Sequence, residues 1–354
     1  MYDVIIIGAG PAGANLARLI GNKYQVLLIE KRDLEIENPN RRLRKCCGGL
    51  LAPDAQKMIV RLGLGIPKDL LVDPQLFAVR TIDLSNNLER LYQRFYTTWT
   101  GKNSTDGWFP LFRPGLSKGT MLFLKALPKY RAAMRLAIFT MGRNCPPKTR
   151  VLVGADGASS KLRRLISPDA NTPQKYIAIQ EWFACSNTMS YYTAIFDEEI
   201  TDFYSWIIPK DEYLLLGAAL KPRENPREKY ELLKRKLTRF GFEFAHKVKT
   251  EGAFILRPRK ASQFYTGRDN IAFIGEAAGA ISPSSAEGIS YALKSSLYLA
   301  QSLEEGLDGF LDRYQKKVKE LRFNLLRKIL KSPAMYHPML RYWAMKSGLQ
   351  SIKQ

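Results

Sequence analysis

The sequence predicts an α/β protein in which a parallel βαβ unit at the amino terminus is interleaved with an antiparallel sheet and followed by a C-terminal helical tail. Two patterns predict this arrangement. Residues 2–7 form a β-branched run that enters a glycine turn, and a helical pattern over 14–20 and a second strand over 25–29 follow. Later in the chain, hydrophobic runs alternate as the strands of a sheet do, at 175–185, 191–196, 203–208 and 213–220. We expect a surface helix over 224–239, where Lys and Arg dominate and apolar residues are sparse.

Composition sets the broad class of the protein. The chain has 354 residues, of which 45% are hydrophobic and 25% charged, so we expect a folded protein with a sizeable core. Four cysteines are too few for a disulfide scaffold and suit a reducing cytoplasm, and with two histidines we expect no metal site. No apolar run approaches the roughly 20 residues that span a bilayer. We therefore expect a cytoplasmic protein, either free or resting on a membrane surface.

A glycine-rich turn links the first strand to the first helix. Gly8 permits the tight turn, Gly10 lets the backbone approach a pyrophosphate, and Gly13 lets helix and strand pack closely. The helix N-terminus then stabilises the phosphate charge. Glu30 ends the second strand, where its carboxylate can accept hydrogen bonds from the adenosine ribose hydroxyls. Strand, turn, helix, strand and acid together predict a Rossmann-type dinucleotide-binding domain.

Two further stretches indicate which dinucleotide binds. Residues 151–160, V-L-V-G-A-D-G-A-S-S, resemble the "DG" motif of the flavoprotein monooxygenases and their relatives, and residues 270–279, N-I-A-F-I-G-E-A-A-G, resemble their second FAD motif. In that superfamily an acid of the second motif touches the flavin ribityl chain. The resemblance implies this role for Glu276, which stands where Asp is usual and is one methylene longer. Gly288 and Ile289 fit the helix start that faces the isoalloxazine ring, so the resemblance implies FAD as the cofactor.

Two local stretches resemble one branch of that superfamily. Residues 45–56, K-C-C-G-G-L-L-A-P-D-A-Q, resemble the C-G-G segment of the geranylgeranyl reductase family. Residues 204–209, Y-S-W-I-I-P, resemble that family's Y-x-W-x-F-P motif, with isoleucine where phenylalanine is usual. In the family this second element lines the substrate pocket, so the resemblance implies substrate contacts for Tyr204, Trp206 and Pro209. The same six residues are one substitution away from the W-x-W-x-I-P motif of flavin-dependent halogenases, which are the main competing interpretation.

The residues expected to bind FAD form one set, drawn from the glycine turn, the end of the second strand, the C-G-G segment and the two later motifs. The set comprises Gly8, Gly10, Pro11, Ala12, Gly13, Glu30, Lys31, Arg44, Cys47, Gly48, Gly49, Asp156, Gly157, Gly275, Glu276, Gly288 and Ile289. Plainer interpretations stay open for some members. Cys46 and Cys47 also fit small core residues, and the Tyr204 and Trp206 positions also fit ordinary strand residues on a sheet face.

The resemblance implies reduction of C=C bonds in a geranylgeranyl or other prenyl lipid chain. Hydride would come from reduced FAD and a proton would reach the other alkene carbon, in a dry, aromatic site. Cys47 and Tyr204 are the catalytic candidates near the flavin. The chain has one dinucleotide fingerprint, which FAD takes, so NADPH or a small iron–sulfur protein is expected as the electron donor. The alternatives are a flavin-dependent monooxygenase or halogenase, and a catalytically inactive basic relative.

The formal net charge is +22, and much of it lies near the C-terminal end. Residues 310–354 hold eleven basic and two acidic residues. Such charge suits nucleic-acid binding, but the sequence has no zinc finger, RNP-type or helix-turn-helix motif, so we expect no nucleic acid as partner. An apolar stripe instead predicts a helix that is either packed on the protein or laid on an anionic membrane. The stripe consists of Tyr314, Val318, Leu321, Leu325 and Ile329.

Residues 98–147 depart from the rest of the pattern. Eight basic residues stand against one acidic residue there, and no strand alternation appears where the fold expects a helix and a β-meander. Read from the third base of the Thr98 codon, the possible codons of 98–108 permit M-D-R-E-K-F-D-R-W-L, and relatives of the family carry a D-R-x-x-F-D-x-W-L-like helix at this point. We hypothesise a shifted reading frame here. Around it we expect an FAD-binding domain over 1–50, 148–167 and 255–305, a substrate domain over 51–97 and 168–254, and a basic helical tail over 306–354.

Overall fold

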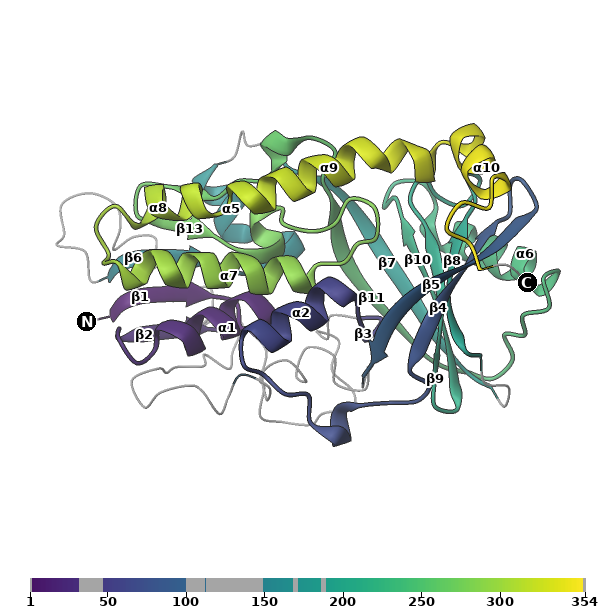
Figure 1. The fold of residues 1–354 in the computed structure, drawn as a ribbon, viewed down its shortest axis with the longest axis horizontal. Coiled ribbons are helices and arrows are strands. Elements are labelled where there is room, and N and C mark those ends of the chain that lie inside the picture. Colours follow the sequence, from purple (N-terminus) through teal and green to yellow (C-terminus); the bar gives the residue numbers. More distant parts are fainter. Residues whose placement is uncertain are drawn as a thin grey trace. The chain divides into compact units, whose positions relative to one another are not determined.

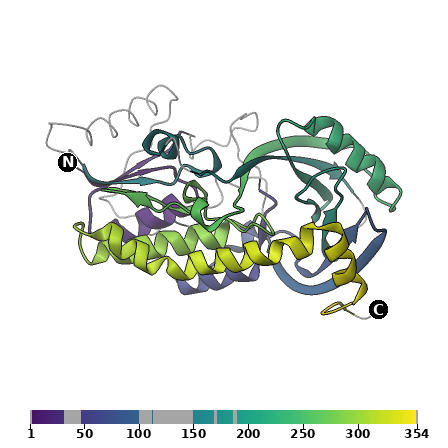
Figure 2. The same ribbon diagram turned by 90° about the horizontal axis from the view of Figure 1, so that it is seen from above.

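The structure is a computed structural model that describes residues 2–31, 47–99, 112, 149–167, 171–185 and 189–352. Figure 1 shows its elements, and Figure 2 shows the same ribbon turned by 90°. The chain divides into two compact units, each assembled from three separate segments. Unit 1 comprises Met1–Leu43, Thr105–Gln174 and Leu256–Ile329, and unit 2 comprises Arg44–Ser104, Lys175–Ile255 and Leu330–Gln354. This interleaving of an α/β unit with an antiparallel unit confirms the predicted fold class.

Unit 1 contains a five-stranded sheet in which four adjacent strands run parallel. Its order is β12-β13-β6-β1-β2, and only β12 is antiparallel to its neighbour. The strands are β1 (Tyr2–Ile7), β2 (Val26–Ile29), β6 (Thr149–Gly154), β12 (Gly267–Arg268) and β13 (Ile271–Phe273). Val4, Ile6 and Val153 are fully buried, as expected for parallel strands covered on both faces. The β-branched run that predicted the first strand is therefore the core of unit 1.

Helices cover this sheet. Those of unit 1 are α1 (Pro11–Ile20), α5 (Lys161–Ile166), α7 (Ile289–Glu304), α8 (Phe310–Lys317) and the first part of α9 (Lys319–Tyr336), with short 3₁₀ turns at Gly157–Ser159, Ala261–Gln263 and Gly275–Ala278. Figures 1 and 2 show α1 and α7 side by side. A buried hydrogen bond of 2.8 Å from Asn15 Nδ2 to Ser296 Oγ joins them. This contact ties the glycine-turn helix to a helix that follows the second FAD-like motif.

The apolar stripe of the tail is part of this core. Tyr314 and Val318 are fully buried, and Leu321 and Leu325 are 2% and 1% exposed. The Tyr314 hydroxyl donates a hydrogen bond of 3.0 Å to the carbonyl of Phe273 in β13. These four residues are therefore packed against the protein, which is one of the two interpretations predicted for the stripe.

Unit 2 is built on an eight-stranded sheet of order β11-β7-β10-β9-β8-β4-β5-β3. The strands are β3 (Leu50–Leu51), β4 (Leu76–Asp83), β5 (Leu88–Thr98), β7 (Gln174–Ala184), β8 (Tyr191–Phe196), β9 (Ser205–Lys210), β10 (Tyr213–Leu220) and β11 (Lys247–Arg257). Four of them confirm the four predicted strands of the antiparallel sheet to within two residues at each end. One pair, β4 with β8, is parallel.

The helices of unit 2 are α2 (Pro53–Arg61), α6 (Pro226–Thr238), α10 (Pro338–Lys346) and the end of α9, and a 3₁₀ turn covers Lys68–Leu70. The surface helix predicted over 224–239 is confirmed as α6, and its few apolar residues form one packed face. Tyr230, Leu233 and Leu237, three and four positions apart, are buried in one hydrophobic cluster with residues of the sheet. Three well-spaced apolar side chains are enough to fix a helix that is otherwise basic.

Some sequence-based predictions fall outside the described residues. Arg44 and Cys46 are among them. So is nearly all of the segment 98–147, for which a shifted reading frame was hypothesised, apart from Thr98, Trp99 and Phe112.

Candidate functional site

The sequence motifs of unit 1 meet at one edge of the five-stranded sheet. In the strand register Ile7 lies opposite Ile29 on one side and Gly154 on the other, and Gly154 lies opposite Phe273. These four residues end β2, β1, β6 and β13 in neighbouring positions. The glycine turn, Glu30, the D-G pair and the second FAD-like motif therefore leave the sheet together at its carboxyl edge, where open α/β sheets bind their ligands.

The three glycines of the turn differ in whether, and why, the position requires glycine. Gly8 has φ +106°, and a Cβ there would lie 2.5 Å from the carbonyl oxygen of Ala155, so only glycine fits. A side chain at Gly13 would collide with the carbonyl oxygen of Gly8. Gly10 differs from both: its φ is −70°, and a Cβ there would meet no atom within 4 Å. The protein itself does not require glycine at Gly10, so the open space beside it is available to a ligand.

Helix α1 presents its N-terminus at this turn. Gly10 is its N-cap and Pro11 its first residue, a position where the missing N–H of proline costs nothing. Ala12, in the first turn, lies 3.0 Å from the point that a Cβ at Gly275 would occupy. No acidic residue lies in the first turn of α1, so the positive end of the helix is left to an anion.

Glu30 is held in place by the glycine turn. It is 3% exposed, and its Oε2 accepts a hydrogen bond of 2.8 Å from the backbone N–H of Ala9. The carboxylate is thus fixed directly beside the turn, at the end of β2. Lys31 follows it and is exposed.

The D-G pair approaches the same turn. The Oδ2 of Asp156 accepts hydrogen bonds from the backbone N–H groups of Lys161 (2.8 Å) and Leu162 (3.4 Å), whereas its Oδ1 is buried without a hydrogen-bond partner. Burial raises the pKa of the Asp156 carboxyl above its usual value, against the opposing effect of these hydrogen bonds. Gly157 has φ +73° with open space where a side chain would point. A buried acceptor left unsatisfied beside a glycine turn suits a ligand that brings a hydroxyl group.

The second FAD-like motif forms a turn and a helix start. Gly275 has φ +57° and donates its N–H to Ser295 Oγ at 2.9 Å. Glu276 Oε1 accepts a hydrogen bond of 2.9 Å from the backbone N–H of Leu256. Gly288 is the N-cap of α7 and Ile289 its first residue, as the sequence predicted. The carboxylate of the motif is therefore oriented by the backbone of unit 1.

In unit 2 the C-G-G segment lies against the Y-x-W-x-I-P strand. A Cβ at Gly48 would lie 2.7 Å from Ile208 Cδ1, and a Cβ at Gly49, which has φ +62°, would collide with Lys210 Nζ. Cys47 is a half-buried free thiol whose sulfur accepts a hydrogen bond of 3.4 Å from the N–H of Gly49. Two stretches that are about 160 residues apart in the sequence, and that resemble two motifs of the same family, are thus in direct contact.

Lys210 is the residue of this region that sequence reasoning missed. It ends β9, is 2% exposed, and donates a hydrogen bond of 2.7 Å to the carbonyl oxygen of Trp99. Burial lowers its pKa to about 8, and the nearby Cys47 opposes this shift. A lysine at the end of a strand is normally expected to be solvent-exposed, and Gly49, which leaves room for its side chain, is the one sequence hint of its burial.

The aromatic residues at the start of β9 and directly before it form a buried wall. Tyr204 and Trp206 are each 8% exposed, with ring centroids 5.4 Å apart, and Tyr204 also contacts Phe203 at 5.1 Å. Pro209 is buried on the same strand. Trp206 lies opposite Gly217 in the register with β10, and a side chain at Gly217 would collide with its indole ring. The glycine of the following strand is therefore required by the tryptophan.

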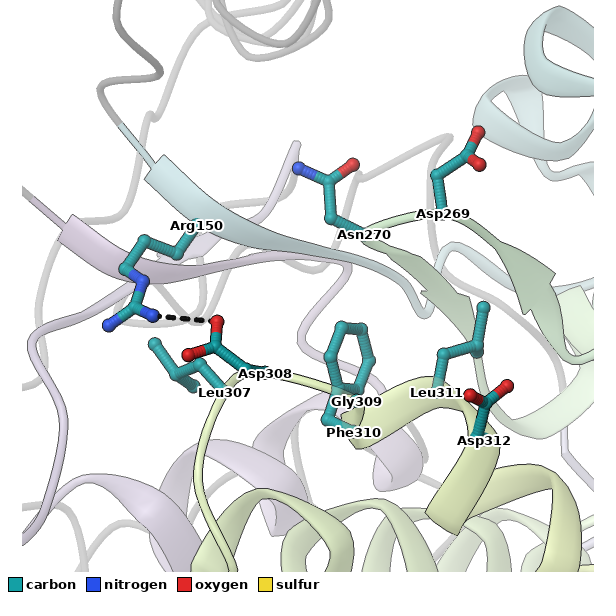
Figure 3. A pocket seen from close by; sticks show the side chains of 9 residues that line it. All are labelled: Arg150, Asp269, Asn270, Leu307, Asp308, Gly309, Phe310, Leu311 and Asp312. Atoms are coloured by element: carbon teal, nitrogen blue, oxygen red, sulfur yellow. Dashed lines mark hydrogen bonds and ion pairs between the residues drawn. The ribbon is translucent and has the colours of Figure 1, made fainter.

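A shallow recess of about 440 Å³ lies elsewhere in unit 1 (Figure 3). Figure 3 shows Arg150 and Asp308 pointing toward each other across it, 2.9 Å apart, with Asp269, Asn270 and Asp312 along the rim. Arg150 is the second residue of β6 and Asn270 directly precedes β13, so the recess lies at the amino ends of these strands. This is the edge opposite the glycine turn, and the recess is no part of the dinucleotide site.

Comparison with known proteins identifies the family. The chain is 39% identical over 354 residues to "Protein CbrA" of Escherichia coli, covering all of this chain and 95% of that protein. The chain belongs to the CbrA family. CbrA of Shigella sonnei matches at 39% identity with 98% of its length covered. No protein-family model matches the chain, and the CbrA name carries no statement of activity.

Solved structures share the fold of this CbrA relative. A geranylgeranyl bacteriochlorophyll reductase-like protein from Thermoplasma acidophilum superposes with a TM-score of 0.69 at 17% identity, and 98% of each chain is covered. PqsL, a probable FAD-dependent monooxygenase from Pseudomonas aeruginosa, gives 0.68 at 18% identity, with 98% of this chain and 99% of that chain covered. The flavin-dependent brominase Bmp2 gives 0.60 at 18%, with 98% and 92% covered. The likeness at these identities is one of fold, and it agrees with the prediction of FAD. Among the described residues, no helix is long and apolar enough to cross a bilayer.

Proposed function

We propose that this CbrA-family protein binds FAD at the carboxyl edge of the five-stranded sheet of unit 1. The observation that carries the proposal is the register that brings the ends of β1, β2, β6 and β13 side by side, so that three separate sequence motifs face one place. The residues fit the cofactor on two counts: a Cβ at Gly10 would meet only open space, and Asp156 Oδ1 is a buried acceptor without a partner.

Each element has a role that its own geometry supports. Gly10 and the N-terminus of α1 accept the pyrophosphate, because the turn leaves space and the helix end supplies positive charge. Glu30, fixed by Ala9, accepts hydrogen bonds from the adenosine ribose. Asp156 and Glu276 are oriented by backbone N–H groups toward hydroxyl donors of the bound cofactor.

We further propose that the protein is an FAD-dependent oxidoreductase that reduces C=C bonds of a prenyl lipid. Bound FAD would supply the hydride. The support in unit 2 is the contact between the C-G-G segment and β9, and the buried aromatic pair Tyr204 and Trp206, which offers a prenyl chain only dispersion and hydrophobic contacts. Cys47 and Tyr204 are the candidate proton donors. The structural neighbour described as geranylgeranyl bacteriochlorophyll reductase-like has the same fold.

The proposed electron donor is NADPH or a small iron–sulfur protein, because the chain has one dinucleotide fingerprint and FAD takes it. The proposed location is the cytoplasm, with contact to a membrane surface where a prenyl lipid would be found. No nucleic acid is proposed as a partner.

A flavin-dependent monooxygenase or halogenase is the second candidate. Residues 204–209 differ by one residue from W-x-W-x-I-P, and PqsL and the brominase Bmp2 share the fold. An inactive basic relative is the third, and it would lack bound flavin.

Spectroscopy of the purified protein distinguishes these functions. The protein is titrated with FAD, reduced anaerobically, and then mixed with a geranylgeranyl lipid or with oxygen. Return of the oxidised flavin bands on adding the lipid alone supports the reductase. Reoxidation that requires oxygen moves the function to a monooxygenase or halogenase. A protein that binds no flavin at any FAD concentration overturns the cofactor proposal itself.

A further inference from the structure

Helix α10 (Pro338–Lys346) presents an apolar face to solvent. Met339, Leu340 and Trp343 are 64%, 47% and 60% exposed, whereas the buried residues of the helix are Arg341 and Met345. Trp343 is three positions from Leu340 and four from Met339, and residues three and four apart are neighbours on one helix face, so the three exposed apolar side chains form one patch. The usual order of an amphipathic helix is reversed here, because an arginine points inward and a tryptophan outward.

This orientation is fixed by specific contacts. Arg341 Nε and Nη2 donate to Asp83 at 2.6 and 3.1 Å, and both side chains are buried. Arg90 Nε donates a hydrogen bond of 3.0 Å to the carbonyl oxygen of Met345. Rotating α10 to bury Trp343 would leave Asp83 as a buried charge without its arginine, which is strongly unfavourable. The exposed patch is therefore a stable feature of unit 2.

Further exposed apolar residues follow the helix, and Lys346 adds positive charge beside Trp343. Leu349 and Ile352 are 75% and 43% exposed, and the N–H of Ile352 donates 2.8 Å to the carbonyl of Leu91, which holds the end of the chain on β5. Lys346 Nζ lies 5.6 Å from the ring centroid of Trp343. Exposed apolar residues of this size in one patch indicate an interaction surface.

The charge of this part of the chain indicates which kind of partner the exposed patch binds. From residue 321 to the end the sequence has seven basic residues and no acidic residue. A lysine stacked on an exposed tryptophan, in a segment without acids, suits the boundary between anionic headgroups and acyl chains. A second copy of this chain would instead bring two equally basic segments face to face, which like-charge repulsion opposes.

We propose that the outer face of α10, formed by Met339, Leu340 and Trp343 with Leu349 and Ile352, docks on the surface of an anionic lipid bilayer. The apolar side chains enter the headgroup region and Lys346 meets lipid phosphates. This surface is different from the apolar stripe of α8 and α9, which is buried. The proposal stands on exposure and charge and does not depend on the proposed reaction.

Vesicle flotation with the full chain tests the proposal. The probes are vesicles of phosphatidylglycerol and phosphatidylcholine in equal parts, and vesicles of phosphatidylcholine alone. We expect flotation with the anionic vesicles, weakened by added salt because screening removes the lysine–phosphate attraction. The fluorescence of Trp343 also reports directly on vesicle binding. Trp99, Trp182 and Trp206 are at most 8% exposed and Trp108 lies outside the described residues, so the part of a blue shift of tryptophan emission that Trp343→Phe removes reports on Trp343.

Three variants and a control separate the contributions of the apolar side chains and of the charge. Trp343→Ser and Leu340→Ser should each lower vesicle partitioning about tenfold, because each removes a large apolar side chain from the bilayer. Lys346→Glu should lower it about tenfold on anionic vesicles through the loss of one attraction and the gain of one repulsion. Val248→Ser removes an exposed apolar side chain of β11, 55% exposed, and should leave partitioning unchanged. All substituted positions are exposed, so equal melting temperatures are expected and checked.

Other outcomes overturn the proposal. Equal flotation with neutral and anionic vesicles contradicts the charge argument. Partitioning that Trp343→Ser and Leu340→Ser leave intact places the contact elsewhere. Absence of flotation together with a concentration-dependent dimer that Trp343→Ser abolishes identifies the patch as an interface between copies of this chain.

Discussion

Arg341 and Asp83, which are 258 positions apart in the sequence, form a buried ion pair through two hydrogen bonds, of 2.6 and 3.1 Å. Asp83 ends β4 and is fully buried, and Asn86 donates two further hydrogen bonds to its carboxylate. Arg341 also contacts the ring face of Phe196 and donates a hydrogen bond of 3.1 Å to the carbonyl oxygen of Met335. The pair thus fixes α10 on the sheet of unit 2.

Removing one partner should destabilise the protein strongly. Arg341→Met leaves the Asp83 carboxylate buried without its counter-charge, and we expect the free energy of unfolding to fall by about 3–5 kcal/mol. The double variant Asp83→Asn/Arg341→Met removes both charges and should recover most of this loss. Denaturant unfolding of the wild type, both single variants and the double variant measures the coupling. Additive losses in the double variant would show that the pair does not act as a unit.

A substitution at Gly10 should affect cofactor binding without affecting the fold. The backbone of Gly10 is in an ordinary extended conformation and a Cβ meets no protein atom, so Gly10→Ala should keep the melting temperature of the apoprotein. The added methyl group occupies the space proposed for the pyrophosphate, and we expect FAD affinity to fall about tenfold or more. Titration of FAD fluorescence measures it. Gly65→Ala, in a loop with the same open space, is the matched control. Equal affinity of Gly10→Ala and wild type would place the pyrophosphate elsewhere.

Stability should depend on pH through Lys210. Burial lowers its pKa in the folded protein to about 8, below the 10.5 of an ordinary lysine. Between these values the unfolded chain binds more protons at this site than the folded protein does, so folding becomes more favourable as pH rises. Relative to Lys210→Met, the wild type should gain about 2–3 kcal/mol of unfolding free energy from about pH 7 to about pH 10. Denaturant unfolding at both pH values measures this. The exposed-lysine control Lys68→Met should track the wild type, and parallel curves for Lys210→Met and wild type would contradict the assignment.

The contact between Gly217 and Trp206 should appear as a coupling energy. A methyl group at Gly217 collides with the indole, so Gly217→Ala should cost about 1–3 kcal/mol of stability through overpacking. In a Trp206→Leu background the collision is relieved and the same substitution should cost much less. Gly252→Ala on β11, whose Cβ would make an ordinary contact of 3.5 Å with the Ala178 carbonyl, is the control. A cost of Gly217→Ala that is equal in both backgrounds would place the strain elsewhere.

Local patterns in the sequence were enough for the strands and the turn, but not for contacts between distant segments. The run over 2–7 and its glycines predicted β1 and the turn, because β-branched residues and φ-positive glycines act on their immediate neighbours. The burial of Lys210 and the pairing of Arg341 with Asp83 depend on which strands become neighbours, and composition does not encode this. The stripe from Tyr314 to Ile329 was predicted to be one face of a single helix, whereas the structure divides it between α8 and α9. Periodicity also could not say whether protein or membrane covers that face.

The three-segment construction of unit 1 has a consequence for how the protein is made. Strand β1 can pair with β2 early, but its other neighbour β6 begins only at Thr149, and α1 meets its hydrogen-bond partner Ser296 only once α7 has been synthesised. The sheet cannot close until β12 and β13, in the segment Leu256–Ile329, have been synthesised, so it stays incomplete for most of translation. Cutting the chain into two contiguous halves would give no foldable unit. We therefore expect the N-terminal part to fold only after the later segments of unit 1 have been synthesised.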